Sequence, residues 1–145
     1  MKIAIGSDHG GFKVKEQLIN FLKKQQYLII DCGCYSEESC NYAQFAIETA
    51  KKVAKNEASI GILICTSGEG VCIAANKIPG IRCGIGYNDE VSKLIKEHND
   101  CNMIAFGARF QTIDEIFRRT QIFIEAKFQG GRHLERVNFI RSIEK

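Results

Sequence analysis

Five short apolar runs alternate with longer amphipathic segments along the chain, and this alternation restricts the fold more than any other feature. The runs are residues 2–5, 28–31, 60–65, 81–86 and 102–106. Each has the length and composition of a strand, while the intervening segments repeat apolar residues with the period of a helix. Strands that alternate with helices form βαβ units, whose right-handed crossovers make a parallel sheet covered on both faces. We therefore predict a single α/β domain, a three-layer αβα sandwich with a five-stranded, mostly parallel, Rossmann-like sheet.

The size and charge of the chain exclude several classes of protein. A chain of 145 residues with 45% hydrophobic and 26% charged residues is typical of one soluble globular domain. The 20 basic and 17 acidic residues are interspersed, and the net charge of +3 is too small to favour nucleic acid as a partner. The first strand-like run begins at Lys2, which leaves no room for a signal peptide or a membrane span. We expect a cytoplasmic protein with no membrane partner.

Seven cysteines raise the question of disulfides or a metal site. The count is odd, and Cys65, Cys72 and Cys83 lie in apolar runs that are typical of buried thiols, so reduced cysteines are expected. Cys32 and Cys34 are separated by one residue, which fits neither a CxxC redox motif nor half of a zinc knuckle. We predict no metal ion. A redox or zinc-binding protein that uses these thiols remains an alternative.

Polar clusters follow three of the predicted strands at the point where each strand ends. Asp8 and His9 follow the first strand, the loop Thr66 to Gly70 follows the third, and Arg109 follows the fifth. In open α/β sheets, ligands bind beyond the carboxyl ends of the strands. We therefore expect these three clusters to converge at one edge of the sheet.

The central loop and the cysteine before it each allow two interpretations. Gly68 and Gly70 let the backbone approach a ligand, and successive N–H groups at a helix start favour an anion, although the loop matches neither a Walker A motif nor GxGxxG. The alternative for the loop is a tight turn. Cys65 is either the last buried position of a strand or a base or nucleophile whose ionised form the helix N-terminus favours.

Histidines and arginines add candidate acid–base and phosphate groups. His98 continues the apolar face of its helix and is predicted to point toward the sheet, whereas histidines such as His9 more commonly contact solvent. Arg132 and Arg136 are one helical turn apart, a spacing that can present two guanidinium groups to one phosphate. The alternative for this pair is a solvated basic face.

Four motifs together resemble the ribose-5-phosphate isomerase type B family, the larger group that also holds the galactose-6-phosphate isomerase subunits. They are "GSDHGGFKVKE", "ILICTSGEGVCIAANK", "HNDCNMIAFGAR" and "GGRHLERV", which cover almost the whole chain in the family's order. The resemblance implies an aldose–ketose isomerase that interconverts ribose 5-phosphate and ribulose 5-phosphate by ring opening and an enediolate intermediate. It implies neither a metal ion nor a cofactor.

The resemblance also implies a role for each matching residue. Cys65 would be the general base, Ser67 would help to move the proton, and His98 would open the sugar ring. The loop that holds Thr66, Gly68, Glu69 and Gly70 would supply N–H groups to the oxyanion. The remaining matching positions would line the sugar (Asp8, Tyr42, Asn99) or contact the phosphate (His9, Arg109, Arg132, Arg136).

The family resemblance further implies a homodimer, which could pair into a tetramer as a dimer of dimers. The C-terminal helix, about 132–145, would reach the neighbouring subunit and supply Arg132 and Arg136 to its site. A six-carbon substrate, allose 6-phosphate or galactose 6-phosphate, is the first alternative, and a nucleotide-binding module is the second. The chain departs from many relatives in having Thr66-Ser67 where they have Gly-Thr, and Asn41-Tyr42-Ala43 where they have Asp-Tyr-Pro.

Overall fold

The five predicted strands form one parallel sheet in the computed structural model, which describes residues 1–144. The strand order is β2-β1-β3-β5-β4, and every neighbouring pair is parallel. The strands are β1 (Lys2–Ser7), β2 (Leu28–Asp31), β3 (Ile60–Cys65), β4 (Cys83–Ile85) and β5 (Met103–Gly107). The helices are α1 (Phe12–Lys24), α2 (Tyr42–Ala54), α3 (Glu69–Ala75), α4 (Asp89–Glu97), α5 (Ile113–Glu125) and α6 (Arg132–Ser142), with a short 3₁₀ turn at His9–Gly11.

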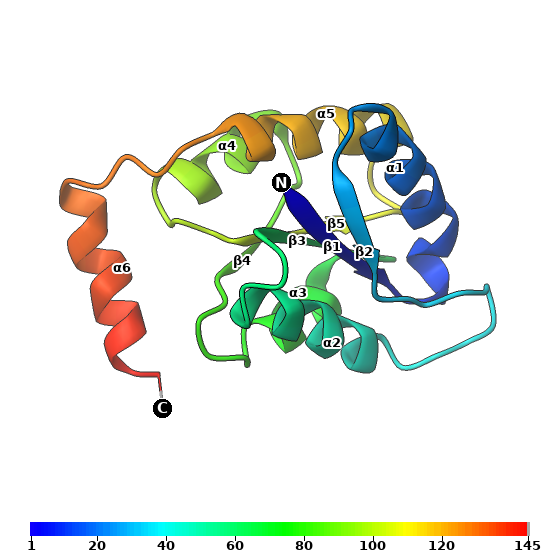
Figure 1. The fold of residues 1–145 in the computed structure, drawn as a ribbon, viewed down its shortest axis with the longest axis horizontal. Helices are drawn as coiled ribbons and strands as arrows, with labels where there is room; N and C mark the ends of the chain where they lie inside the picture. The colour runs from blue at the N-terminus through cyan, green and yellow to red at the C-terminus, as the bar shows by residue number, and fades with distance from the viewer. Residues whose placement is uncertain (145) are drawn as a thin grey trace.

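Helices cover both faces of the sheet, so the predicted αβα sandwich is confirmed. Figure 1 shows α1, α4 and α5 on one side of the strands and α2 and α3 on the other. A capping box of Thr112 and Glu115 starts α5. The predicted fourth strand, 81–86, is shorter than expected because β4 is an edge strand that pairs only with β5.

Side chains of the central strand β3 alternate between two hydrophobic cores. Ile62 and Ile64 pack in the core beneath α1 and α5, while Leu63 and Cys65 belong to the core beneath α2 and α3. All six residues of β3 are buried, as expected for a strand with a neighbour on each edge and helices on each face. The alternation directs the Cys65 side chain toward α2 and α3.

The last helix, α6, stands apart from the three layers. Figure 1 shows it beyond α4 and β4, with the chain terminus pointing away from the sheet. Of its residues only His133 and Val137 are buried, whereas Phe139 is 73% exposed and Leu134 is 43% exposed. The helix therefore has apolar side chains that the rest of this chain does not cover. Lys145, the last residue of the predicted segment 132–145, lies outside the described residues.

No helix within residues 1–144 combines the length and the apolar character that a membrane crossing requires.

A buried ion pair fixes the end of β2 against α1. The Lys15 side chain is fully buried, and its Nζ donates to both carboxylate oxygens of Asp31, at 2.8 and 2.9 Å. The same carboxylate accepts a hydrogen bond from the Gly33 N–H at 3.0 Å. A buried ammonium is costly unless a carboxylate pairs with it, so this contact constrains where the chain enters the loop before α2.

We predict that Asp31→Asn lowers the free energy of unfolding by about 2 kcal/mol, because it replaces the closer carboxylate by a neutral amide and leaves the buried Lys15 ammonium with only the half-exposed Glu16, 3.1 Å away. Urea unfolding at neutral pH measures the change. The matched control is Glu57→Gln, which removes one partner of the exposed pair Lys52–Glu57 and should leave the midpoint nearly unchanged. Equal effects of the two substitutions would contradict the structural role of Lys15.

Candidate active site

Backbone hydrogen bonds join the three loops that were predicted to converge. The Asp8 N–H donates to the Ile64 carbonyl at 3.3 Å, and the Ala108 and Arg109 N–H groups donate to the carbonyls of Cys65 and Thr66 at 2.8 and 3.1 Å. The convergence is therefore confirmed. β1 and β3 are neighbours in the sheet. From β1 the chain continues to β2 on one side, and from β3 it continues to β4 and β5 on the other side. A ligand crevice forms at such a reversal of strand order.

Cys65 ends β3 with its sulfur held by the loop that follows. The residue is 5% exposed, and its Sγ accepts a hydrogen bond from the Gly68 N–H at 3.1 Å. Gly68 has a φ of +82°, a conformation that suits glycine, and it turns the chain directly into α3. The first turn of α3 has N–H groups with no partner inside the helix, so the thiol lies beside backbone amides.

Close packing around this loop brings Tyr42 to the same place. A Cβ added to Gly70 would lie 2.6 Å from the Tyr42 ring, which shows that the ring lies directly against the start of α3. Thr66, Ser67 and Glu69 are exposed, and the Ser67 hydroxyl accepts a hydrogen bond from the Glu69 N–H at 3.2 Å. The loop therefore presents two hydroxyls and a carboxylate to the space outside the sheet.

The loop after β1 contributes a carboxylate and an imidazole with defined hydrogen bonds. Asp8 is 6% exposed and accepts from the Gly11 N–H at 3.1 Å. His9 accepts from the Cys40 N–H through Nδ1 at 3.2 Å. Because Nδ1 is an acceptor in this contact, the neutral ring has its hydrogen on Nε2. His9 can therefore donate a hydrogen bond from Nε2.

A surface pocket of about 440 Å³ adjoins these loops. Its lining includes Gly10, Lys13, Thr66 and Arg109. Arg109 and the Thr66 hydroxyl favour an anionic group, and Lys13, which pairs with the exposed Glu37 at 3.2 Å, adds a second positive charge. Sequence reasoning missed Lys13. The sequence did contain a signal for Lys13: it lies in the first turn of α1, directly after the loop that holds the predicted ligands Asp8 and His9.

The structure places the other predicted residues at the opposite end of the strands, where the amino ends of the parallel strands lie. α4 runs back from the carboxyl end of β4, so His98 and Asn99, which follow α4, precede the amino end of β5. Cys65 pairs with Gly107 at the other end of β5. Met103 to Gly107 spans about 13 Å at a strand's usual rise. Within one chain, His98 and Asn99 are therefore separated from Cys65 by the length of the sheet.

Arg132 and Arg136 belong to this second group. Both are exposed on α6, one turn apart as predicted, and α6 begins beside His98. The His98 and His133 rings stack with centroids 4.1 Å apart and an interplanar angle of 11°. The expected sites thus divide into two half-sites, one around Cys65 and one around His98.

His133 is a member of the second half-site that sequence reasoning did not single out. Desolvation lowers its pKa, and the nearby positive charges of His98, Arg132 and Arg136 lower that pKa further. The His133 ring is therefore favoured in its neutral form. The signal in the sequence was a histidine on the same helix turn as two predicted phosphate ligands.

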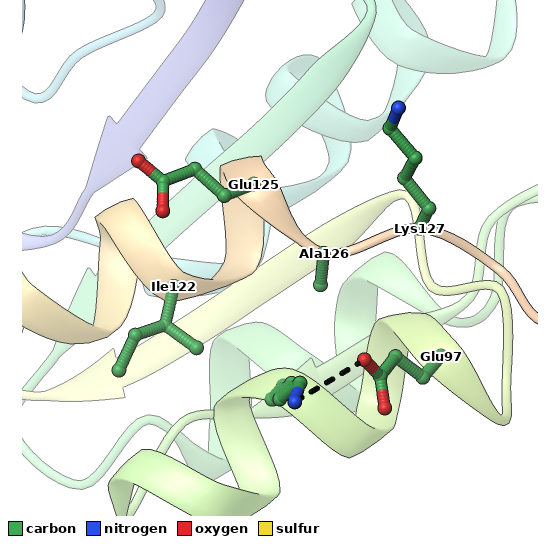
Figure 2. Close-up of a pocket in the computed structure, with 6 residues that line it drawn as sticks. Glu97, Ile122, Glu125, Ala126 and Lys127 are labelled. Carbon is green, nitrogen blue, oxygen red and sulfur yellow. Dashed lines mark ion pairs between the residues drawn. The ribbon is translucent and has the colours of Figure 1, made fainter.

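A different hollow of about 440 Å³ lies between α4 and α5 (Figure 2). Its lining residues are Lys93, Glu97, Ile122, Glu125, Ala126 and Lys127. Lys93 and Glu97 pair with each other at 3.6 Å, and Figure 2 shows Glu125 and Lys127 pointing away from the space between the helices. The charges are therefore already compensated or directed elsewhere, and none of the predicted site residues takes part.

The cysteines are all free thiols, and within residues 1–144 no group of three or more His, Cys, Asp or Glu side chains is arranged to hold a metal ion. Burial raises the pKa of Cys101 to about 12. That thiol is consequently neutral at physiological pH.

Comparison with known proteins shows what the chain is similar to. Residues 3–140 match the family model described as Ribose/Galactose Isomerase. Ribose-5-phosphate isomerase B of Escherichia coli is 38% identical over 144 residues, with 99% of this chain and 97% of that protein covered. The Clostridium thermocellum ribose-5-phosphate isomerase B structure aligns with a TM-score of 0.97 at 43% identity, covering 99% and 97% of the two chains. The Mycoplasma genitalium enzyme with bound ribulose-5-phosphate aligns with a TM-score of 0.93 at 36% identity, covering 97% and 94%.

The contact between Gly10 and Thr66 predicts an energetic coupling of the two loops. A Cβ on Gly10 would lie 2.5 Å from the Thr66 Oγ1, so Gly10→Ala should cost about 1–2 kcal/mol of folding free energy. In a Thr66→Ala background, which lacks this oxygen, most of that cost should disappear. Urea unfolding of the four proteins in the double-mutant cycle measures the coupling, and equal costs in both backgrounds would show that the loops do not touch.

Proposed function

Because the chain belongs to the ribose/galactose isomerase family, we propose that it interconverts ribose 5-phosphate and ribulose 5-phosphate. The relatives at 38% and 43% identity are named for this activity, and both comparisons span nearly the full length of each chain. The observation that carries the proposal is the Cys65 thiol, held by the Gly68 amide among the loops that end β1, β3 and β5. That arrangement supplies a base, amide donors and a cationic pocket in one place.

Cys65 is the general base in this proposal. Its thiolate removes the proton from C2 of the open-chain aldose, the C2 electrons form the enediolate, and the same thiol returns a proton to C1 to give the ketose. The thiolate is regenerated at the end of each turnover. Proton transfer by a positioned side chain typically contributes 10²–10⁴-fold to the rate.

The loop after Cys65 stabilises the charge that develops on the sugar oxygens. Gly70 lies in the first turn of α3, where N–H groups have no partner within the helix and can donate to an oxyanion. The exposed Ser67 hydroxyl can donate to one sugar oxygen and accept from the other, which moves a proton between O1 and O2. Asp8 and the Tyr42 ring border the same loop and are assigned to the sugar.

The phosphate is assigned to the cationic side of the half-site. His9 can donate from Nε2 because its Nδ1 is occupied by the Cys40 amide. Arg109 lines the adjoining pocket and can contribute a charged, bidentate donor. Holding the phosphate at a fixed distance from Cys65 orients the sugar carbons toward the base.

A second copy of the chain completes the site. Ring opening needs an acid or base, and His98 with Asn99 is a sheet length from Cys65 in the same chain. A twofold dimer presents the same surface from each copy, so the half-site around His98 on one chain can cover the half-site around Cys65 on the other. The protruding α6 supports this arrangement, because its exposed apolar residues and both arginines are available to a neighbour.

Two alternatives to the pentose phosphate are retained. A six-carbon sugar phosphate would use the same groups, and a nucleotide-binding module would use only the loop and the cationic pocket. The cytoplasmic location also stays a prediction. A coupled assay that compares ribose 5-phosphate with allose 6-phosphate and galactose 6-phosphate separates the substrates, and calorimetry with ATP detects the binding module.

We predict that ribose 5-phosphate has the highest kcat/KM in this assay and that Cys65→Ala lowers kcat by about 10²–10⁴-fold. The variant should keep its circular dichroism spectrum, because the change removes only one sulfur atom. Cys32→Ser is the matched control, since that thiol lies outside the site and its replacement should preserve turnover. Near-normal turnover of Cys65→Ala would remove the cysteine from the chemistry.

A complementation experiment tests the divided site. Cys65→Ala and His98→Asn should each be nearly inactive as homodimers. Joint refolding of equal amounts produces heterodimers in half of the population, each with one intact and one doubly defective site, so about one quarter of the wild-type activity should return. If mixing restores nothing above the sum of the two variants, each chain contains its own complete site and the proposed arrangement is wrong.

A further inference from the structure

We propose that Cys34 and Cys40, which flank an exposed loop beside His9, form a reversible disulfide. This pair is a thiol modification site next to the half-site around Cys65. Neither thiol has a role in the proposed isomerisation. Both lie in the segment between β2 and α2, which contains neither a helix nor a strand. The inference about its effect on activity rests on the proposed function, whereas the disulfide itself does not.

Ser7, the last residue of β1, and His9, two residues later, each anchor one of the two cysteines by a hydrogen bond. The Cys34 N–H donates to the Ser7 carbonyl at 2.8 Å, and the Cys40 N–H donates to His9 Nδ1 at 3.2 Å. Ser7 and His9 are separated by one residue, so the anchors of Cys34 and Cys40 are near neighbours along the chain.

The sulfur atoms share the same surroundings. Cys34 Sγ lies 3.9 Å from Ser7 Oγ and Cys40 Sγ lies 3.8 Å from His9 Nδ1, and burial together with the nearby Cys34 thiol raises the pKa of Cys40. Residues 35–39 between them are exposed, with Tyr35 68% exposed. An exposed loop without regular structure can readjust when the sulfurs approach bonding distance, which a pair inside a packed helix and strand cannot do.

Thiol–disulfide exchange with a small disulfide such as oxidised glutathione supplies a balanced route. The Cys40 thiolate attacks one sulfur of glutathione disulfide and releases one glutathione thiolate. Cys34 then attacks the Cys40 sulfur of this mixed disulfide and releases the second glutathione. Two protein thiols lose two electrons in total, glutathione disulfide is reduced to two thiols, and the two protein protons pass to the released thiolates.

The rate of this exchange should increase with pH. Burial raises the pKa of the Cys40 thiol, so the thiol is protonated at neutral pH and the attacking thiolate becomes available in alkaline solution. The exchange is therefore slow at neutral pH. We expect faster disulfide formation at about pH 9 than at about pH 7.

Oxidation should weaken substrate binding through His9. Drawing Cys40 toward Cys34 moves the Cys40 N–H and sulfur away from Nδ1, and His9 loses the contact that fixes its tautomer. Loss of one such hydrogen bond corresponds to a rise in KM on the order of fivefold to tenfold, with kcat changing less.

The test is peptide mapping of the full-length protein after incubation with oxidised glutathione and capping of free thiols. Cleavage after Glu37 and Glu38 places Cys34 and Cys40 on separate peptides, which stay joined only through a disulfide. The joined peptides should form in the wild type, disappear with dithiothreitol, and be absent from Cys34→Ser and Cys40→Ser. The matched control Cys32→Ser should still form them, because Cys32 lies on the same peptide as Cys34 but faces α2.

The outcomes separate this proposal from the proposed function. Separate, individually capped or glutathionylated peptides after oxidation at alkaline pH would overturn the disulfide site. A joined peptide that persists in Cys34→Ser would also overturn it, since Cys32 would then be the partner. If the reduced protein shows no isomerase activity, the proposed function fails while the mapped disulfide stands. If the disulfide forms and KM is unchanged, the predicted effect on His9 is wrong.

Discussion

The common direction of the five strands determines where every functional group of this chain can lie. Parallel strands place all their carboxyl ends at one edge, so the residues after β1, β3 and β5 meet there and are joined by backbone hydrogen bonds. Each helix between the strands must return to the opposite edge before the next strand begins. His98, which follows such a helix, and α6, which follows α5, are therefore placed at the far edge from Cys65 by the topology itself. No local adjustment of side chains can unite them within one chain.

This separation explains why α6 extends away from the sheet with exposed apolar side chains. A helix with Phe139 and Leu134 in solvent is unfavourable for an isolated chain, and the same helix has two arginines on adjacent turns. Burying its apolar side against a second copy would favour association and deliver the arginines to the cationic pocket in one step. The His98–His133 stack at the start of α6 positions that helix relative to α4. Association would also cover Cys65 and exclude water from the enediolate.

The sequence permitted most of the fold to be predicted because its signals are local. The spacing of apolar residues along the chain identifies the strands and helices. Because the strands are parallel, their carboxyl ends meet, which predicts that Asp8, Thr66 and Arg109 converge. The location of His98 was harder, because its place on an apolar helix face says nothing about which edge of the sheet it occupies. The helix between β4 and β5 runs antiparallel to the strands, so a residue at its end lies at the opposite end of the strands from Cys65. The contact of Gly10 with Thr66, the tautomer of His9 and the stack on His133 depend on tertiary distances, which no pattern along the chain contains.

The central claim is that one sugar phosphate is bound between two chains, with the base from one and the ring-opening histidine from the other. A crystal structure of the protein with ribulose 5-phosphate measures this directly. The account predicts that Cys65 Sγ lies within about 3.5 Å of C1 or C2 of the sugar, a near-attack separation, and that the nearest imidazole at position 98 comes from the partner subunit. A ligand bound within one chain, or one located away from the sulfur, would contradict it.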